Sequence, residues 1–197
     1  MQEKSAFITL LGRPNVGKSS LLNRLVGQKV AIVSDKPQTT RTRISGVLTD
    51  GSVQYVFVDT PGFHKPRNLL GDNMIKAINS GLSDIDGAIL VVDACPDFKL
   101  NPEALPPAEL SLIDNLRTRG IPCILVLNKI DKLAEKDELL KLISIYSPLY
   151  DFKAVVPLSA MTGDGIKILL DEISDFAKES VHYFADDDFT DQPEQVM

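Results

Sequence analysis

Residues 12–19 read Gly-Arg-Pro-Asn-Val-Gly-Lys-Ser, which is a complete phosphate-binding loop pattern. The apolar run Ala6–Leu11 precedes the loop, and the amphipathic stretch Ser20–Val26 follows it. A strand that leads through such a loop into a helix directs successive backbone N–H groups and the helix N-terminus toward one anion. The pattern therefore predicts a strand, loop and helix unit that binds a nucleoside polyphosphate.

The fixed positions of the loop each have a physical role. Gly12 and Gly17 let the backbone approach a phosphate oxygen closely, Lys18 reaches the β- and γ-phosphates, and the hydroxyl of Ser19 suits Mg²⁺. The predicted phosphate-binding residues are Gly12, Arg13, Pro14, Asn15, Val16, Gly17, Lys18, Ser19 and Ser20.

The composition fits one intracellular domain. The chain has 197 residues, 44% hydrophobic and 24% charged, which is enough to bury one full-sized core. The net charge of −6 argues against a broadly basic nucleic-acid-binding surface. Cys95 and Cys123 lie in or beside apolar runs, so we expect reduced core thiols rather than a disulfide. No apolar stretch approaches the ~20 residues that span a bilayer.

Short apolar runs alternate with amphipathic segments along the chain. The predicted strands are Ala6–Leu11, Arg43–Thr49, Val53–Val58, Gly87–Val92, Pro122–Leu127 and Ala154–Leu158. The predicted helices are Ser20–Val26, Asn73–Gly81, Pro107–Arg119, Lys136–Tyr146 and Ile166–Ser180. This alternation predicts an α/β fold with a mostly parallel six-stranded sheet and helices on both faces.

One pair of strands departs from the parallel pattern. Asp50-Gly51 separates Arg43–Thr49 from Val53–Val58 and is a strong hairpin signal, so this pair should be antiparallel. In mostly parallel sheets, ligands lie beyond the carboxyl ends of the strands. The residues that follow each strand are therefore the next candidates for binding.

Asp59-Thr60-Pro61-Gly62 follows the strand Val53–Val58. The carboxylate of Asp59 can serve Mg²⁺ directly or through water, and the amide of Gly62 can approach a γ-phosphate closely. A lone Asp-Thr-Pro-Gly is more often a simple turn, so its position after a strand carries the argument.

Asn128-Lys129-Ile130-Asp131 follows the strand Pro122–Leu127. The carboxylate of Asp131 can accept hydrogen bonds from N1–H and the 2-amino group of guanine, whereas adenine has no proton at N1. Lys129 can lie along the base, and Asn128 can tie this loop to the phosphate loop. Ser159, Ala160 and Met161 follow the next strand, and their backbone amides could meet the carbonyl oxygen of guanine.

With these elements in order, the chain resembles a translation-factor-related GTPase over about residues 5–180. The resemblance implies a P-loop NTPase G domain that binds GTP or GDP with Mg²⁺ and hydrolyses GTP. Sites carried over from it are catalytic Lys18, Asn15, Thr40 and Gly62, metal-binding Ser19, Thr40 and Asp59, and nucleotide-binding Thr39, Thr60, Pro61 and Phe63.

The polar segment that ends in Asp35-Lys36-Pro37-Gln38-Thr39-Thr40-Arg41 narrows the family. It is similar to the first switch of the Era GTPases, whose Thr-Thr-Arg run also marks the tRNA-modification and double-domain ribosome-assembly GTPases. The resemblance implies that Thr40 joins Mg²⁺ when the γ-phosphate is present, and that Gln28–Arg41 and Thr60–Asn73 order and release with the nucleotide. The alternative is an ordinary surface loop rich in Ser and Thr.

Hydrolysis also requires an aligned water. Ras-like relatives use a glutamine at the place that Phe63 occupies here, and an apolar ring cannot hydrogen-bond the water, so slow intrinsic turnover is expected. In related GTPases that K⁺ stimulates, an asparagine of the phosphate loop helps to hold that ion. We hypothesise that Asn15 does so here, the alternative being a turn cap, and we assign no role to His64.

Residues 181–197 are acidic and without periodicity, as a linker would be, and resemble the connector that leads to an RNA-binding KH domain in Era proteins. No helix–Gly-x-x-Gly–helix pattern occurs in this chain, so a KH domain is expected to be absent from it. The family resemblance implies a cytoplasmic monomer with a role in 16S rRNA processing and small ribosomal subunit assembly, and peripheral association with the inner face of the cell membrane.

Three other classes fit part of the pattern. A P-loop ATPase or kinase would lack the guanine-binding carboxylate, and a nucleotide-binding adaptor would keep the pocket but release no phosphate. A different Thr-Thr-Arg GTPase, acting in tRNA modification or metal transport, would differ in its flanking domains.

Overall fold

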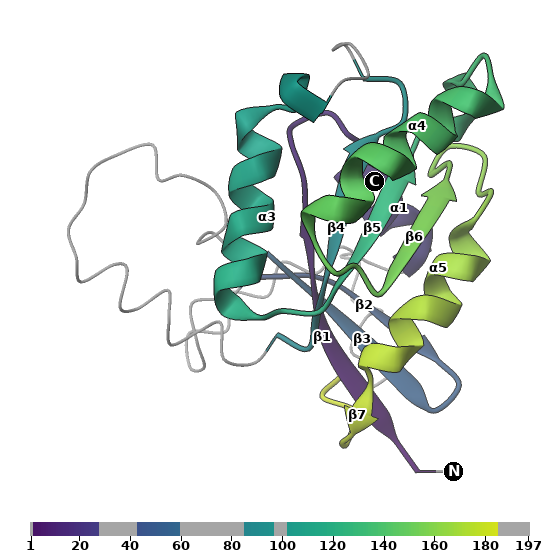
Figure 1. Cartoon of the computed structure of the whole chain (residues 1–197). Coiled ribbons are helices and arrows are strands. Elements are labelled where there is room, and N and C mark those ends of the chain that lie inside the picture. The colour runs from purple at the N-terminus through teal and green to yellow at the C-terminus, as the bar shows by residue number, and fades with distance from the viewer. Residues whose placement is uncertain (1, 28–42, 60–84, 97–101, 185–197) are drawn as a thin grey trace, which may run out of the picture.

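The computed structural model describes residues 2–27, 43–59, 85–96 and 102–184 (Figure 1). The strands are β1 (Lys4–Leu11), β2 (Arg43–Asp50), β3 (Val53–Asp59), β4 (Gly87–Asp93), β5 (Cys123–Asn128), β6 (Ala154–Leu158) and β7 (Lys178–Glu179). The α-helices are α1 (Lys18–Val26), α3 (Pro107–Arg119), α4 (Lys136–Tyr146) and α5 (Ile166–Ile173). The expected helix Asn73–Gly81 lies outside the described residues.

The sheet has the order β2-β3-β1-β4-β5-β6. β3, β1, β4, β5 and β6 run parallel, whereas β2 pairs with β3 antiparallel across a two-residue turn at Gly51 and Ser52. The six expected strands and the antiparallel hairpin are therefore confirmed. Because the chain leaves β1 at the point where strand order reverses, the phosphate loop lies at the switch point of the sheet, where ligands bind in such folds.

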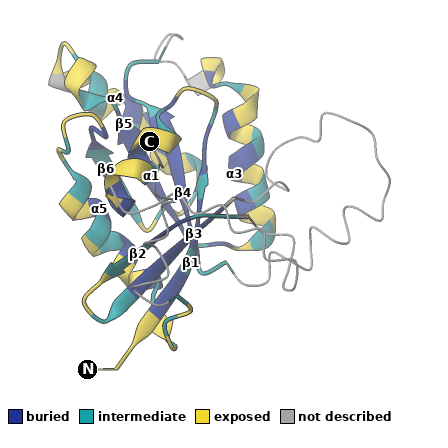
Figure 2. Ribbon diagram, turned by 180° about the vertical axis from the view of Figure 1, so that it is seen from behind, coloured by how far each residue is buried: buried dark blue, intermediate teal, exposed yellow. Residues whose placement is uncertain are grey.

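The four helices of the described residues cover both faces of the sheet, as expected. α1 and α5 pack on one face through Leu21, Leu25 and Leu169, while α3 and α4 pack on the other through Leu116 and Leu142. Figures 1 and 2 show these pairs from opposite sides, with the buried strands between them. All residues of β5 are buried, which explains why this strand reads as an uninterrupted apolar run.

Two helices begin and end where their sequence signals place them. α3 starts at Pro107, whose fixed φ suits the first helical position, and stops before Gly120, which has φ 62°. α4 covers Lys136–Tyr146, as predicted. Among the described residues, none of the helices has the length and apolar character that crossing a bilayer requires.

The predicted helix Ile166–Ser180 is wrong in its last part. α5 ends at Ile173, a 3₁₀ turn follows at Ser174–Phe176, and β7 then pairs antiparallel with β1. The ring of Phe176 packs on Gly87, where an added Cβ would lie 2.3 Å from the ring. This contact and the pairing with β1 turn the chain back along the sheet, and neither leaves a local signal.

The last described residues, 180–184, lie against the β1 and β3 side of the sheet. The buried side chain of Gln54 accepts hydrogen bonds from the amides of Tyr183 and Phe184, at 2.8 and 3.1 Å, and donates to the carbonyl of Phe184 at 2.9 Å. The ring of Tyr183 meets Phe7 edge to face, with centroids 5.1 Å apart. The chain therefore stays on the domain through residue 184.

Candidate functional site

The phosphate loop connects β1 to α1 and contains two glycines with positive φ. Gly12 has φ 148°, and a Cβ there would lie 2.4 Å from the carbonyl oxygen of Val91. Gly17 has φ 99°, and a Cβ there would lie 2.2 Å from Nδ2 of Asn128. Both positions require glycine for backbone conformation and for space. The expectation that these glycines let the backbone approach a phosphate oxygen closely stays a prediction.

Lys18 is the first residue of α1 and its ammonium lies over the loop. Nζ donates to the carbonyl oxygens of Gly12 and Arg13, each at 2.7 Å. The positive charge is therefore held inside the curve of the loop, beside the helix N-terminus. Pro14, Asn15, Ser19 and Ser20 are exposed around it, so the loop presents polar groups to a ligand.

Asn128 joins two loops, as its sequence position predicted. It is the last residue of β5 and is buried, and its Nδ2 donates to the carbonyl oxygen of Val16 at 2.8 Å. Its Oδ1 accepts from the backbone N–H of Ala160 at 3.0 Å. One amide side chain thus connects the phosphate loop to the loops that follow β5 and β6.

Lys129 follows in the left-handed conformation, with φ 75°. Its ammonium donates to the carbonyl oxygen of Asn15 at 2.7 Å and forms an ion pair with Asp93 at the end of β4. The side chain of Lys129 therefore also connects to the phosphate loop, at a main-chain carbonyl of that loop. Asp93 is a part of the site that the sequence reasoning missed, although it follows a buried strand as the other candidates do.

Asp131 and Ser159 lie side by side at the same edge of the sheet. The hydroxyl of Ser159 donates to Oδ1 of Asp131 at 2.5 Å and also accepts from the amide of Thr162 at 3.1 Å. Asp131 is exposed on a 3₁₀ turn, while Ser159 and Ala160 are buried. The carboxylate of Asp131, which is predicted to bind the base, therefore faces solvent. Its partner Ser159 is buried and is also bonded to the amide of Thr162.

The structure thus brings three predicted groups together: the phosphate loop, the Asn128–Asp131 segment and the Ser159–Met161 segment. Asp59 is the last residue of β3. Because β3 pairs parallel with β1, the backbone of Asp59 lies at the same edge of the sheet as the phosphate loop. The remaining candidates Thr39, Thr40, Thr60, Pro61, Gly62 and Phe63 lie outside the described residues.

A buried carboxylate behind the phosphate loop was missed from the sequence. Glu109 of α3 is 1% exposed, and it accepts from Nε of Arg13 at 2.6 Å and from the hydroxyl of Tyr146 on α4. Burial raises the pKa of Tyr146, and the nearby charge of Glu109 adds to that shift. Glu109 occupies the helical face of Leu112, Ile113 and Leu116, and a carboxylate on an apolar face is a usable signal.

Comparison with known proteins shows which family the chain matches. Residues 7–129 match the family model described as "50S ribosome-binding GTPase". GTPase Era of Clostridioides difficile (strain 630) is 45% identical over 194 residues, which is 98% of this chain and 63% of that protein. The chain therefore spans less than two thirds of the length of this relative.

Two solved structures have the same fold. The structure of Era in complex with MgGDPNP and nucleotides 1506–1542 of 16S ribosomal RNA has a TM-score of 0.71 and 33% identity, covering 94% of this chain and 61% of that one. Aquifex aeolicus Era, as a variant bound to GDP and AlF₄⁻, has a TM-score of 0.69 and 33% identity, covering 96% and 62%. The resemblance to Era and the P-loop GTPase fold expected from the motifs are confirmed, and the chain belongs to the 50S ribosome-binding GTPase family.

Proposed function

We propose that this chain binds GTP and GDP with Mg²⁺ and hydrolyses GTP as a molecular switch. The observation that carries the proposal is the bridge made by Asn128, which fixes the loop of Asp131 and the amide of Ala160 against the phosphate loop. A purine and its phosphates can thus be gripped at one edge of the sheet. The family match and the guanine nucleotides bound in the two Era structures support the same ligand.

The phosphate loop supplies positioning and charge. Loss of the γ-phosphoryl group spreads negative charge over its oxygens, so catalysis depends on electrostatic stabilisation. Lys18, at the N-terminus of α1, lies where it can exchange its two carbonyl partners for phosphate oxygens. Neutralisation by Lys18 and by the loop amides, which replace water around the phosphates, is the contribution of the described residues.

Mg²⁺ fits the residues present only with the help of the nucleotide. Among the residues that the structure describes, no cluster of three or more His, Cys, Asp or Glu side chains could hold a metal ion. Ser19 offers one exposed hydroxyl in the first turn of α1, and Thr40 and Asp59 are the further candidates by resemblance. When bound, Mg²⁺ would neutralise phosphate charge. The hydroxyl of Ser19 would help to hold the ion.

K⁺ is a second expected cation. Asn15 has φ 65°, its carbonyl accepts from Lys129, and its side chain lies in an exposed part of the loop. The backbone is thus fixed, while the exposed amide can face the phosphates. We propose that Asn15 contributes to a K⁺ site, in which case GTP hydrolysis is faster in KCl than in NaCl and Asn15→Ala removes the difference. Equal wild-type rates in the two salts would contradict this role.

The biological role is proposed from resemblance. The resemblance to Era implies a role in 16S rRNA processing and small ribosomal subunit assembly. The Era structure with 16S ribosomal RNA supports this RNA as the partner. By the same resemblance we propose a cytoplasmic monomer that associates peripherally with the membrane. Light scattering tests the oligomeric state, and co-sedimentation with anionic vesicles tests membrane association.

The direct test is phosphate release in Mg²⁺ and K⁺ with GTP and, separately, with ATP. We expect slow release from GTP, none above background from ATP, and loss of activity in Lys18→Ala. Equal use of ATP would favour a P-loop ATPase. Tight GDP binding without phosphate release over hours would favour an adaptor, and rescue of a tRNA-modification or metal-transport defect would favour another Thr-Thr-Arg GTPase.

A further inference from the structure

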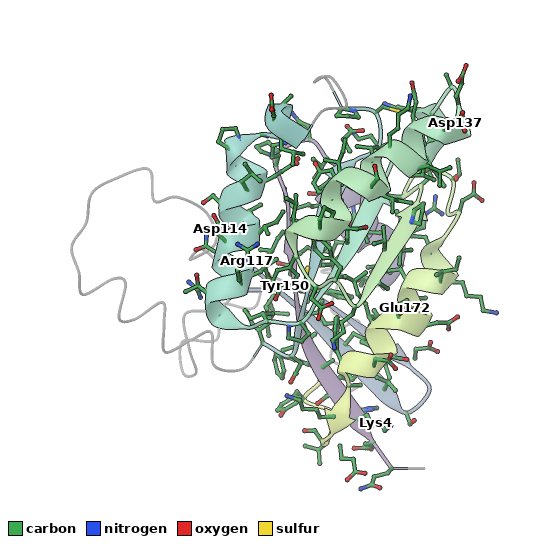
Figure 3. All side chains as sticks on the ribbon, viewed as in Figure 1. Lys4, Asp114, Arg117, Asp137, Tyr150 and Glu172 are labelled. Carbon is green, nitrogen blue, oxygen red and sulfur yellow. The ribbon has the colours of Figure 1, made fainter. Side chains whose placement is uncertain are left out.

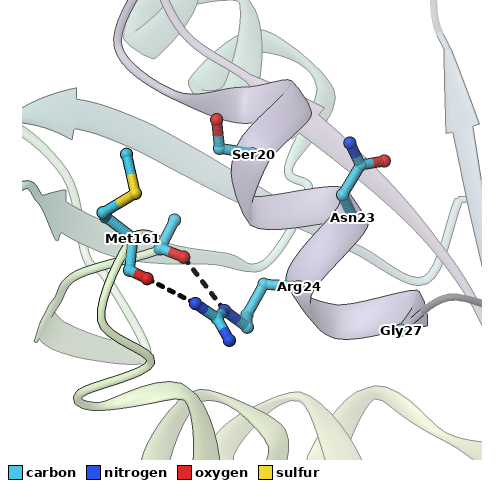
Figure 4. Close-up of a pocket in the computed structure, with 6 residues that line it drawn as sticks. Ser20, Asn23, Arg24, Gly27 and Met161 are labelled. Carbon is cyan, nitrogen blue, oxygen red and sulfur yellow. Dashed lines mark hydrogen bonds between the residues drawn. The ribbon is translucent and has the colours of Figure 1, made fainter.

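Arg24 reaches from α1 to the loop that follows β6 (Figure 4). Its Nε donates to the carbonyl oxygen of Ala160 at 3.0 Å, and one of its terminal nitrogens donates to the carbonyl oxygen of Met161. Arg24 and Ala160 are 136 residues apart in the sequence. One guanidinium therefore holds two consecutive carbonyl groups of the segment predicted to face the purine.

Fixing a carbonyl also fixes an amide. In a trans peptide the C=O and the next N–H lie in one rigid plane and point in opposite directions. When Arg24 holds the carbonyl of Ala160, the N–H of Met161 must point away from α1. The N–H of Ala160 donates to Oδ1 of Asn128 at 3.0 Å, and this hydrogen bond fixes the preceding peptide. Asn128 thus orients the amide of Ala160, and Arg24 orients the amide of Met161.

The segment needs such an anchor because its surroundings are open. Met161 is 77% exposed, and a groove of about 580 Å³ separates the segment from α1, lined by Ser20, Asn23, Arg24, Gly27, Ala160 and Met161. Gly163 follows with φ 94°, and a Cβ added there would lie 3.8 Å from Cζ of Arg24. The guanidinium therefore lies over the turn at Gly163 as well as donating to the carbonyls of Ala160 and Met161.

We propose that Arg24 is a specificity-determining positioning residue, which directs the backbone amide of Met161 at the oxygen on position 6 of the purine. The inference rests on the proposed function, since it presumes a guanine nucleotide. It goes beyond that function in assigning base recognition to a residue of the helix that follows the phosphate loop. Arg24 acts through the loop and not by touching the reacting phosphates.

The test measures equilibrium affinity for three diphosphates by calorimetry. GDP has the oxygen at position 6 and the 2-amino group, IDP lacks only the 2-amino group, and 6-thio-GDP replaces the oxygen with sulfur, a weak acceptor. In Arg24→Ala we expect the GDP and IDP affinities to fall by roughly tenfold each, and the 6-thio-GDP affinity by less than about threefold. The losses of affinity in Arg24→Lys should lie in between, because an ammonium is a point donor without the planar fork of a guanidinium.

Arg117→Ala is the matched control. Arg117 of α3 is an exposed arginine that also donates to a backbone carbonyl, that of Leu149, far from the phosphate loop (Figure 3). It should leave all three affinities unchanged. Thermal unfolding without nucleotide checks that each variant is folded.

An equal fall for all three diphosphates in folded Arg24→Ala would overturn the inference, because general loosening of the site cannot tell oxygen from sulfur. Unchanged GDP affinity would overturn it as well. A wild-type protein that binds none of the three would instead overturn the proposed function, so the two failures are distinguishable.

Discussion

Nδ2 of Asn128 lies 2.8 Å from the carbonyl oxygen of Val16, and both residues are buried. The same amide lies so close to Gly17 that a Cβ there would be 2.2 Å away. The contact between the end of β5 and the phosphate loop is therefore fixed by packing as well as by a hydrogen bond. The segments proposed to bind the base and the phosphates consequently share one rigid link.

Asn128→Ala should weaken both stability and nucleotide binding. The substitution leaves the Val16 carbonyl and the Ala160 amide without their partner, so the free energy of unfolding should fall by roughly 1–3 kcal/mol. Urea denaturation measures the loss, and stopped-flow release of a fluorescent GDP should be faster. Thr118→Ala, at an exposed position of α3, serves as the control, with a change within about 0.5 kcal/mol. Wild-type stability in Asn128→Ala would show that the link is dispensable.

Asp131→Asn should change which base is bound. An amide presents a donor where the carboxylate presented an acceptor, so guanine nucleotides bind more weakly and xanthine nucleotides more tightly; loss of such complementarity costs roughly 10⁴ in discrimination. Oδ1 still accepts from Ser159, so the loop should keep its shape. Competition of GDP and XDP for a fluorescent nucleotide gives the ratio. Asp137→Asn, an exposed acid at the start of α4, should not alter the ratio (Figure 3).

If GDP affinity is unchanged in Asp131→Asn, the carboxylate does not read the base.

Tyr146→Phe should cost stability behind the phosphate loop. The ring stays, but Oε2 of the buried Glu109 loses its donor, so the free energy of unfolding should fall by roughly 1–3 kcal/mol. Tyr150→Phe is a matched control because its hydroxyl donates to a neutral acceptor, the carbonyl of Ile121, at 2.7 Å, and should cost about 1 kcal/mol (Figure 3). Urea denaturation compares the two, and a smaller loss in Tyr146→Phe than in Tyr150→Phe would contradict the role of Glu109.

Much of the fold is predictable because its strands are buried on both faces. β4 and β5 read as continuous apolar runs, and α3 carries a proline and a glycine at its two ends. The bridging role of Asn128 is also predictable, since residues that follow parallel strands converge at one edge. These inferences need only local pattern and the geometry of α/β sheets.

The parts that could not be predicted depend on long-range contacts. α5 ends early because Phe176 packs on Gly87, and residues 180–184 stay on the sheet because Gln54 holds them. Arg24 lies between Asn23 and Leu25 of α1, and nothing local distinguishes it from any exposed arginine. The two switch segments lie outside the described residues, so Thr40 and Gly62 stay predictions.

Alkaline pH should destabilise the protein through its buried thiol. Burial raises the pKa of Cys123 from 9.0 to about 12 in the folded protein. Below pH 9 both folded and unfolded chains keep this proton, so its contribution is constant. Above pH 9 the unfolded chain loses the proton while the folded one retains it, so the free energy of unfolding should fall by about 1.4 kcal/mol per pH unit for this group. Urea denaturation of wild type and Cys123→Ala between pH 7 and 10 isolates the effect, because the variant lacks the thiol and should lose less stability above pH 9. Parallel curves for the two proteins would mean that the thiol at position 123 does not govern the alkaline loss.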